Sequence, residues 1–288
     1  MTAPAAPGAA FSVVVPAHDE ERVLGRCLRS FVPDLRPGEA EVVVVANGCT
    51  DRTAEVARSF PGVVVVEVAA ASKPGALDAG DAAVAAFPRV YLDADVTVSV
   101  AAIRAVVAAL GEPGVHAAAP RARFDLAGRP AAVRSFYRAY QRMPYLSEAL
   151  VGTGFYALSA EGRARFGRFP ALTADDLFVQ RLFDRSERVV LADREFVVQA
   201  PRTLRALLAV RTRVAFGNAE LAASDPADAA VGASTGGSVA SLVRMARADV
   251  RRVPDVAVYV GVTAAARARA ARRRGRATRV WDRDDSSR

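Results

Sequence analysis

Residues 87–99 read Phe-Pro-Arg-Val-Tyr-Leu-Asp-Ala-Asp-Val-Thr-Val-Ser, an apolar run that ends in two carboxylates. The run Val90–Leu92 predicts a short buried strand. In an extended backbone, residues two apart point to the same side, so Asp93 and Asp95 would present both carboxylates to one point. A hard divalent cation or a cation-bridged diphosphate requires such a pair. Taken alone, the two aspartates fit a polar turn after a strand at least as well.

Three β-branched runs precede this stretch, and each leads through a polar turn into a segment with helical spacing of apolar residues. The runs are 11–15, 41–46 and 63–68, and we expect the alanine-rich helix after the third run to extend to about Phe87. Strands that alternate with helices at this short spacing predict an α/β fold. The expected architecture is a Rossmann-like, mainly parallel central sheet that is covered by helices on both faces.

Polar turns follow all four expected strands, at 16–20, 46–51, 72–75 and 93–95. In parallel α/β sheets, ligands bind beyond the carboxyl ends of the strands, so these turns are expected to line one rim. Lys73, the only lysine among 39 basic residues, falls in the third turn. Its ammonium is a candidate point charge for a phosphate, and chance survival on a solvated loop is the alternative.

The chain has 288 residues, of which 52% are hydrophobic and 24% charged, which suits one large domain with an appendage. Cys27 and Cys49 are its only cysteines, which excludes a disulfide scaffold and a cysteine-rich metal site. No apolar run reaches the ~18 residues of a membrane-spanning helix. Residues 1–10 lack the positive charge and the apolar core of an export signal. We therefore expect a cytoplasmic protein.

The formal charge of +8 is concentrated near the C-terminus, where residues 264–288 carry nine arginines and three aspartates. A local excess is not the footprint of a nucleic-acid-binding domain, so no nucleic-acid partner is expected. This end is either a helix packed on the domain and followed by a charged tail, or a peripheral contact with the inner, anionic membrane surface. In the second interpretation, the apolar contacts would come from Val256, Val258, Tyr259 and Val262.

The sequence predicts four segments. Residues 1–9 are expected to be a disordered N-terminus, and residues 10–215 the α/β domain. Residues 216–274 are expected to form a helical C-terminal extension with a flexible connection near 224–238, and residues 275–288 a disordered basic tail.

Four motifs occur in a fixed order between Ser12 and Asp95. They are Ser-Val-Val-Val-Pro-Ala-His-Asp-Glu-Glu from Ser12, Val-Val-Ala-Asn-Gly-Cys-Thr-Asp-Arg-Thr at 44–53, Lys-Pro-Gly-Ala-Leu-Asp-Ala-Gly at 73–80 and Leu-Asp-Ala-Asp at 92–95. Together they resemble the motifs of family 2 glycosyltransferases with the GT-A fold. One motif alone would not be specific, but four in this order are.

The resemblance implies a nucleotide-sugar donor of the UDP or GDP type and Mg²⁺ or Mn²⁺ as cofactor. It implies that Asp93 and Asp95 hold the metal and the ribose or diphosphate. Asn47 or Asp51 occupies the place of an acidic residue that contacts the base. The implied donor-nucleotide-binding residues are Pro16, Ala17, His18, Glu20, Asn47, Asp51, Lys73 and Asp93.

The resemblance also implies roles in the second half of the chain. Gly152, Thr153 and Gly154 resemble the segment beneath the acceptor site, although a tight turn explains the glycines as well. Asp175 and Asp176 match the acidic segment that supplies the catalytic base. Helix capping and the helix dipole account for the same two aspartates, and the sequence does not separate one from the other.

Arg211 and Arg213 are candidates for a basic segment that closes over the diphosphate, with the solvated face of a helix as the alternative. The reaction implied by the resemblance is inverting transfer of a hexosyl group from a nucleotide-diphosphate-sugar to an acceptor hydroxyl, with an Asp as general base. A non-catalytic nucleotide-sugar-binding protein is one alternative. A sugar nucleotidyltransferase is another, but the loop after its first strand should be basic and glycine-rich, whereas the loop at 16–21 is acidic and has no glycine.

Overall fold

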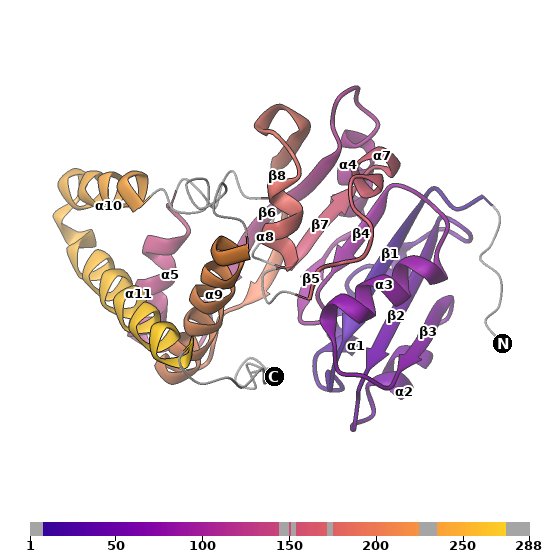
Figure 1. Ribbon diagram of the computed structural model, residues 1–288, viewed down its shortest axis with the longest axis horizontal. Coiled ribbons are helices and arrows are strands. Elements are labelled where there is room, and N and C mark those ends of the chain that lie inside the picture. The colour runs from indigo at the N-terminus through magenta and orange to yellow at the C-terminus, as the bar shows by residue number, and fades with distance from the viewer. Residues whose placement is uncertain (1–7, 144–149, 151–153, 172–174, 225–234, 275–288) are drawn as a thin grey trace. The chain divides into compact units, whose positions relative to one another are not determined.

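A computed structural model describes residues 8–143, 150, 154–171, 175–224 and 235–274 of the chain (Figure 1). The chain divides into two compact units. The first comprises residues 1–123, 150–171 and 179–198, and the second comprises residues 124–149, 172–178 and 199–288. The domain boundaries expected from the sequence stay a prediction, as do the disordered ends, because residues 1–7 and 275–288 lie outside the described residues.

The first unit is built on one eight-stranded sheet in the order β3-β2-β1-β4-β7-β6-β8-β5. The strands are β1 (Phe11–Ala17), β2 (Ala40–Asn47), β3 (Val63–Val68), β4 (Arg89–Leu92), β5 (Val96–Val98), β6 (Ala117–Asp125), β7 (Phe155–Leu158) and β8 (Arg188–Gln199). Neighbours within the group β3, β2, β1 and β4 are parallel, whereas β7 runs antiparallel to both β4 and β6. The parallel half confirms the expected Rossmann-like core.

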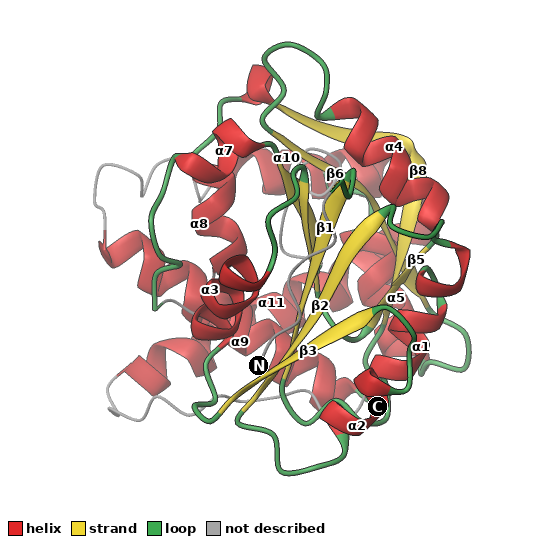
Figure 2. Ribbon diagram, turned by 90° about the vertical axis from the view of Figure 1, so that its right-hand side faces the viewer, coloured by secondary structure: helices red, strands yellow, loops and turns green. Residues whose placement is uncertain are grey.

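Helices cover both faces of the parallel half of the sheet. The helices of the first unit are α1 (Leu24–Arg29), α2 (Thr53–Arg58), α3 (Lys73–Ala83), α4 (Val100–Ala109) and α7 (Ala160–Ala164), with single 3₁₀ turns at Val32–Asp34 and Arg185–Glu187. Figure 2 shows α3 on one side of β1, β2 and β3, and α1 and α2 on the other. The valines of β1 and β2 are fully or almost fully buried between these layers, so the sheet itself forms the core.

Helix α3 ends at Ala83, earlier than the expected end near Phe87. The chain is already extended at Val84, and the Glu41 carboxylate accepts hydrogen bonds from the backbone N–H groups of Ala85 (2.7 Å) and Ala86 (2.9 Å). Because the helical conformation is disfavoured before Pro88, this carboxylate replaces the hydrogen bonds that a longer helix would have made. A second difference is β5, a three-residue strand directly after the aspartates, which pairs with β8.

The second unit contains α5 (Ala131–Tyr140), the first part of α8 (Asp175–Arg181) and the three long C-terminal helices. The C-terminal helices are α9 (Leu204–Ser224), α10 (Thr235–Ala248) and α11 (Val253–Arg274), with a 3₁₀ turn at Val250–Arg252 between the last two. Helix α11 packs on α5 and α9, and its Tyr259 stacks on Phe136 with ring centroids 5.3 Å apart. Among the described residues, no helix is long and apolar enough to span a membrane.

Part of the membrane interpretation drawn from the sequence is wrong. Tyr259 and Val262 are only 6% and 9% exposed, because they form the side of α11 that packs within the second unit. They are therefore not available for contact with lipid.

We predict that Gly80→Ala destabilises the protein, because a Cβ at this position would lie 2.3 Å from Cγ1 of Val14 in β1. Overpacking of this kind typically costs about 1–3 kcal/mol. Urea unfolding of the variant should show a lower midpoint. Gly167→Ala is the matched control, because no atom lies within 4 Å of its added Cβ. Equal midpoints for the two variants would contradict the tight packing of α3 on β1.

Candidate functional site

Four loops leave the carboxyl ends of β1, β2, β3 and β4 and meet along one edge of the parallel sheet, as the strand order and direction require. These loops carry the polar turns that the sequence analysis singled out. The first unit therefore has a polar rim where α/β sheets of this kind bind ligands.

The first and second loops are joined by hydrogen bonds between the backbone of one and the side chains of the other. The N–H of Glu20 donates to Oγ1 of Thr53 (2.6 Å), and the N–H of Glu21 donates to Oδ2 of Asp51 (3.1 Å). Asp51 also accepts hydrogen bonds from Thr53. The structure thus places Asp51 as a brace between the two loops that precede α1 and α2.

Asn47, the last residue of β2, is 1% exposed and joins three loops. Its Nδ2 donates to the carbonyl of Ala17 (2.7 Å), its Oδ1 accepts from the N–H of Ser72 (3.1 Å), and its own carbonyl oxygen lies 2.6 Å from Nδ1 of His18. Both ends of the buried amide are thus used by the protein itself. The side chain holds the first loop and the third loop at a fixed separation.

Lys73 and Asp93 lie together, as the rim predicted from the sequence requires. Ser72 caps α3 by accepting a hydrogen bond from the N–H of Gly75, which places Lys73 in the first turn of the helix. The Nζ of Lys73 then lies 3.0 Å from Oδ1 of Asp93, and the two side chains are 25% and 37% exposed. An ion pair between the third and fourth loops is therefore accessible from solvent.

The two aspartates are held in a turn and not in the extended backbone assumed from the sequence. The N–H of Val96 donates to the carbonyl of Asp93 (3.4 Å), and Asp93 itself donates to the carbonyl of Gly154 (2.8 Å). Gly154 has a φ of 95°, and a Cβ there would lie 3.1 Å from the Asp93 carboxylate. A side chain at this position would therefore crowd Asp93.

Arg26 and Cys27 in α1 are near the aspartates, and the sequence analysis assigned neither to the site. A guanidinium nitrogen of Arg26 donates to the carbonyl of Asp95 (3.1 Å), and its Nε is buried with no hydrogen-bond partner among the described residues. Burial raises the pKa of the Cys27 thiol, and the negative charges of Asp95 and Asp93 raise it further. No motif signals Arg26, because only the packing of α1 brings it there.

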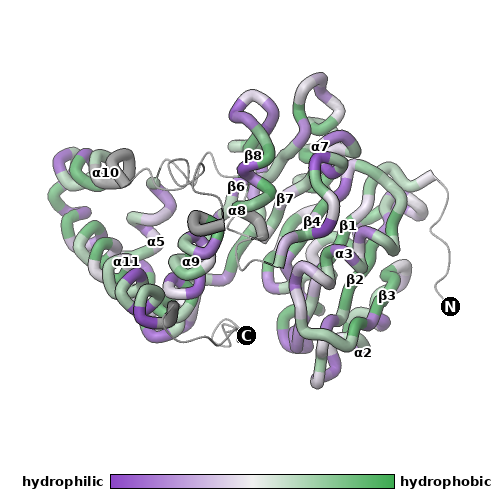
Figure 3. Tube along the Cα trace, viewed as in Figure 1, coloured by the Kyte–Doolittle hydropathy of each residue, from purple (hydrophilic) through white to green (hydrophobic). Residues whose placement is uncertain are grey.

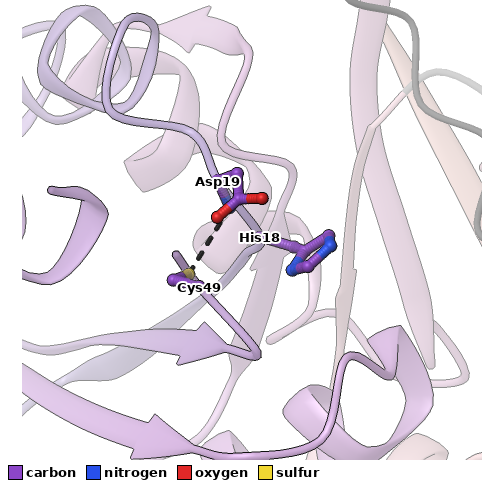
Figure 4. Close-up of side chains that lie close together, drawn as sticks. All are labelled: His18, Asp19 and Cys49. Atoms are coloured by element: carbon purple, nitrogen blue, oxygen red, sulfur yellow. Dashed lines mark hydrogen bonds between the residues drawn. The ribbon is translucent and has the colours of Figure 1, made fainter. Parts of the chain in front are cut away.

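Within the described part of the chain, one group of three potential metal ligands lies close together, His18, Asp19 and Cys49 (Figure 4). The N–H of Asp19 donates to Sγ of Cys49 (3.4 Å), and the carboxylate of Asp19 accepts from the N–H of Thr50 (2.6 Å). Burial raises the pKa of the Cys49 thiol, and the hydrogen bonds of Asp19 join the first loop to the second. We therefore interpret this group as a loop brace. Carboxylate oxygens suit Mg²⁺ and Mn²⁺, so Asp93 and Asp95 stay the candidates predicted from the sequence.

The remaining candidates belong to the second unit or lie outside the described residues. Asp175 and Asp176 begin α8, and their side chains lie outside the described residues, as do Gly152 and Thr153 entirely. Arg211 belongs to α9 of the second unit, where its guanidinium carbon lies 4.9 Å from the ring centroid of Tyr140. Arg213 is on the same helix and is half-buried. Their roles in catalysis, in acceptor binding and at the diphosphate stay predictions.

Comparison with curated proteins gives a local likeness. The chain is 41% identical over 59 residues to the 4,4'-diaponeurosporenoate glycosyltransferase of Staphylococcus aureus (strain USA300). The match covers 20% of this chain and 15% of that protein, so it concerns only a small part of the relative's length.

Two solved structures share the fold over most of the chain. The mannosyltransferase PcManGT from Pyrobaculum calidifontis, in complex with GDP-Man and Mn²⁺, is 21% identical, with a TM-score of 0.66 over 94% of this chain and 89% of that one. Glucosyl-3-phosphoglycerate synthase from Mycobacterium tuberculosis, in complex with Mn²⁺ and UDP-Glc, is 24% identical, with a TM-score of 0.52 over 72% and 77%.

Residues 7–175, more than half of the chain, match the family model described as "Glycosyltransferase like family 2". The match covers all four strand-end loops of the rim, and the sheet with its C-terminal helices agrees with the GT-A neighbours. The protein therefore belongs to the family 2 glycosyltransferases and has the GT-A fold.

Proposed function

We propose that the protein transfers a hexosyl group from a nucleotide-diphosphate-sugar to an acceptor hydroxyl, with inversion at the anomeric carbon. The observation that carries the proposal is the meeting of Lys73 with Asp93 on a rim that also holds Asp95. Such a pair suits a diphosphate that binds together with a metal cation. The ammonium would contact the phosphate oxygens, and the carboxylates would hold the cation. The neighbours that bind GDP-Man and UDP-Glc support a donor of the GDP or UDP type.

We propose that the first loop binds the nucleotide. Pro16, Ala17, His18 and Glu20 lie at or just after the end of β1, on the same rim as the Lys73–Asp93 pair. We assign Asn47 a positioning role and not a contact with the base, because both ends of its amide are bonded to neighbouring loops. Asp51 likewise braces the second loop, through Glu21 and Thr53.

The carboxylates of Asp93 and Asp95 would hold Mg²⁺ or Mn²⁺, and their oxygen donors fit such a hard ion. When bound, the metal supplies stabilisation for the negative charge that develops on the leaving diphosphate. Lys73 adds a second positive charge at Asp93, and Arg26 adds a third at the Asp95 backbone. In the proposed mechanism, these residues hold the donor while the acceptor approaches from the opposite face of the sugar.

Asp175 or Asp176, at the start of α8, is the proposed general base that takes the proton from the acceptor hydroxyl. We further propose that the segment Gly152–Gly154 lies on the acceptor side and that Arg211 and Arg213 serve the diphosphate. Cytoplasmic action is part of the proposal. A peripheral contact with an anionic membrane surface through the arginine-rich C-terminal helices is compatible with it.

Asp95→Asn should weaken metal-dependent donor binding, because it removes one of the two carboxylate charges. Thermal shift with UDP- and GDP-sugars, with and without Mn²⁺, measures this effect, since a donor at ~100 times its dissociation constant adds ~2.7 kcal/mol to stability. Asp193→Asn is the control, because that side chain is 72% exposed in β8. A Mn²⁺-dependent shift that survives in Asp95→Asn would count against the assigned metal residues.

Replacing the base should stop turnover and spare donor binding. We expect one of the two variants, Asp175→Asn or Asp176→Asn, to lower kcat by ~10²–10⁴, which is the rate enhancement that a general base typically provides. The other variant should stay near the wild-type rate. Donor binding by calorimetry should be unchanged in both. If both variants turn over at the wild-type rate, neither aspartate is the base. Donor binding by the wild type without any turnover would favour the non-catalytic binding protein.

Asn47→Asp tests the positioning role against a contact with the base. A carboxylate oxygen would replace the amide nitrogen that donates to the carbonyl of Ala17, and the lost bond and the repulsion would disturb the first loop. A buried group left without its partner costs about 1–3 kcal/mol of stability, and we expect the disturbed loop to bind the donor more weakly. Asn218→Asp, on an exposed position of α9, is the matched control. Equal or tighter donor binding by Asn47→Asp would instead indicate that residue 47 reads the base.

A further inference from the structure

The outward side of α11 is apolar over its first three turns. Val253 and Val260 are 44% and 48% exposed and lie seven residues apart, which places them on one face of the helix. Ala257, Gly261 and Ala264 are exposed on or beside the same face. This stripe is distinct from the side of α11 that packs within the second unit. A solvent-facing stripe without charge is unusual for a surface helix, so it requires an explanation.

The apolar surface continues beyond the start of α11. Val250, in the 3₁₀ turn between α10 and α11, is 76% exposed, and Val243 near the end of α10 is 43% exposed. Four of the five exposed large hydrophobic residues in the described chain thus fall within 243–260. We call the corner made by the end of α10, the 3₁₀ turn and the start of α11 the valine corner. Figure 3 shows hydrophobic and hydrophilic residues side by side along these helices.

Arginines surround the valine corner. Arg244, Arg247 and Arg251 are exposed beside Val243 and Val250 in the sequence. Residues 240–272 contain two carboxylates, and both are paired with arginines. Asp249 lies 3.2 Å from Arg252, and Asp255, which is 8% exposed, accepts two hydrogen bonds from Arg138. The corner therefore presents positive charge together with protruding aliphatic side chains.

We propose that the valine corner docks the protein on the surface of an anionic lipid bilayer. Aliphatic side chains enter the boundary between headgroups and acyl chains, and guanidinium groups bind the lipid phosphates above them. The inference identifies the surface for the peripheral contact in the proposed function, and it requires no assumption about the catalytic residues. It also moves the contact from Tyr259 and Val262 to residues that are exposed.

The charge of the corner disfavours a second copy of the chain as its occupant. A twofold interface would place the same arginines opposite one another, and the carboxylates in 240–272 are already paired. A bilayer with negative headgroups has the opposite charge and also accepts the valines. Charge complementarity thus selects the lipid surface.

The test is flotation of the full chain with phosphatidylcholine vesicles that contain or lack phosphatidylglycerol. We expect binding only when the anionic lipid is present. The triple variant R244A/R247A/R251A should lose about a hundredfold in partitioning, and V250D/V253D should abolish binding. Leu204→Asp, at another exposed hydrophobic residue of the second unit, and Arg194→Ala, at an exposed arginine of β8, should bind as the wild type does.

Three results would overturn the proposal. They are equal binding to neutral vesicles, undiminished binding by V250D/V253D, and loss of binding only when residues 275–288 are deleted. Sedimentation velocity without lipid identifies the rival occupant, since a dimer that V250D/V253D dissociates would make the corner an interface between copies. Circular dichroism checks that the variants fold. Donor binding measured on the same variants should be unchanged, so failure of the docking surface and failure of the glycosyltransferase assignment give different results.

Discussion

The buried amide of Asn47 is the interaction on which the arrangement of the site depends. Among the described residues at the end of β2, it is the only polar side chain that bonds to both the first loop, at Ala17, and the third loop, at Ser72. Ser72 in turn caps α3 and thereby fixes Lys73. An amide suits this task because it donates at one end and accepts at the other, whereas a carboxylate only accepts. One side chain thus positions both the first loop and the lysine that pairs with Asp93.

The rim holds groups of both charges. Asp93 pairs with Lys73, and a guanidinium nitrogen of Arg26 donates to the backbone carbonyl of Asp95. Partly exposed ion pairs contribute little to stability, so the Lys73–Asp93 pair is able to exchange partners. In the proposed function, the new partners would be the diphosphate and the metal.

A second network fixes β4 from the side opposite to its loop. Asp81 in α3 is bonded by Arg89 at 2.7 Å, by Arg163 at 2.6 Å and by the hydroxyl of Tyr91 at 2.7 Å. Burial raises the pKa of Tyr91, and the charge of Asp81 raises it further, so the phenol stays a hydrogen-bond donor. Because breaking one member of such a buried set leaves another charge uncompensated, the network holds α3, β4 and α7 in one arrangement. Asp93 and Asp95 follow β4 directly, so the network also restricts the position of their backbone.

The parallel α/β core, the order of the strand-end loops and the family follow from the amino-acid sequence, because apolar periodicity and short motifs are local properties. It also placed Lys73 and Asp93 on one rim, since parallel strands end at the same edge. Three features became evident only from the folded chain: Asn47 is a buried brace, Asp93 and Asp95 lie in a turn against Gly154, and Arg26 contacts Asp95. These facts depend on contacts between residues far apart in the chain. The same holds for α11, where the helical spacing of valines is evident but packing alone decided that Tyr259 is buried and Val260 exposed.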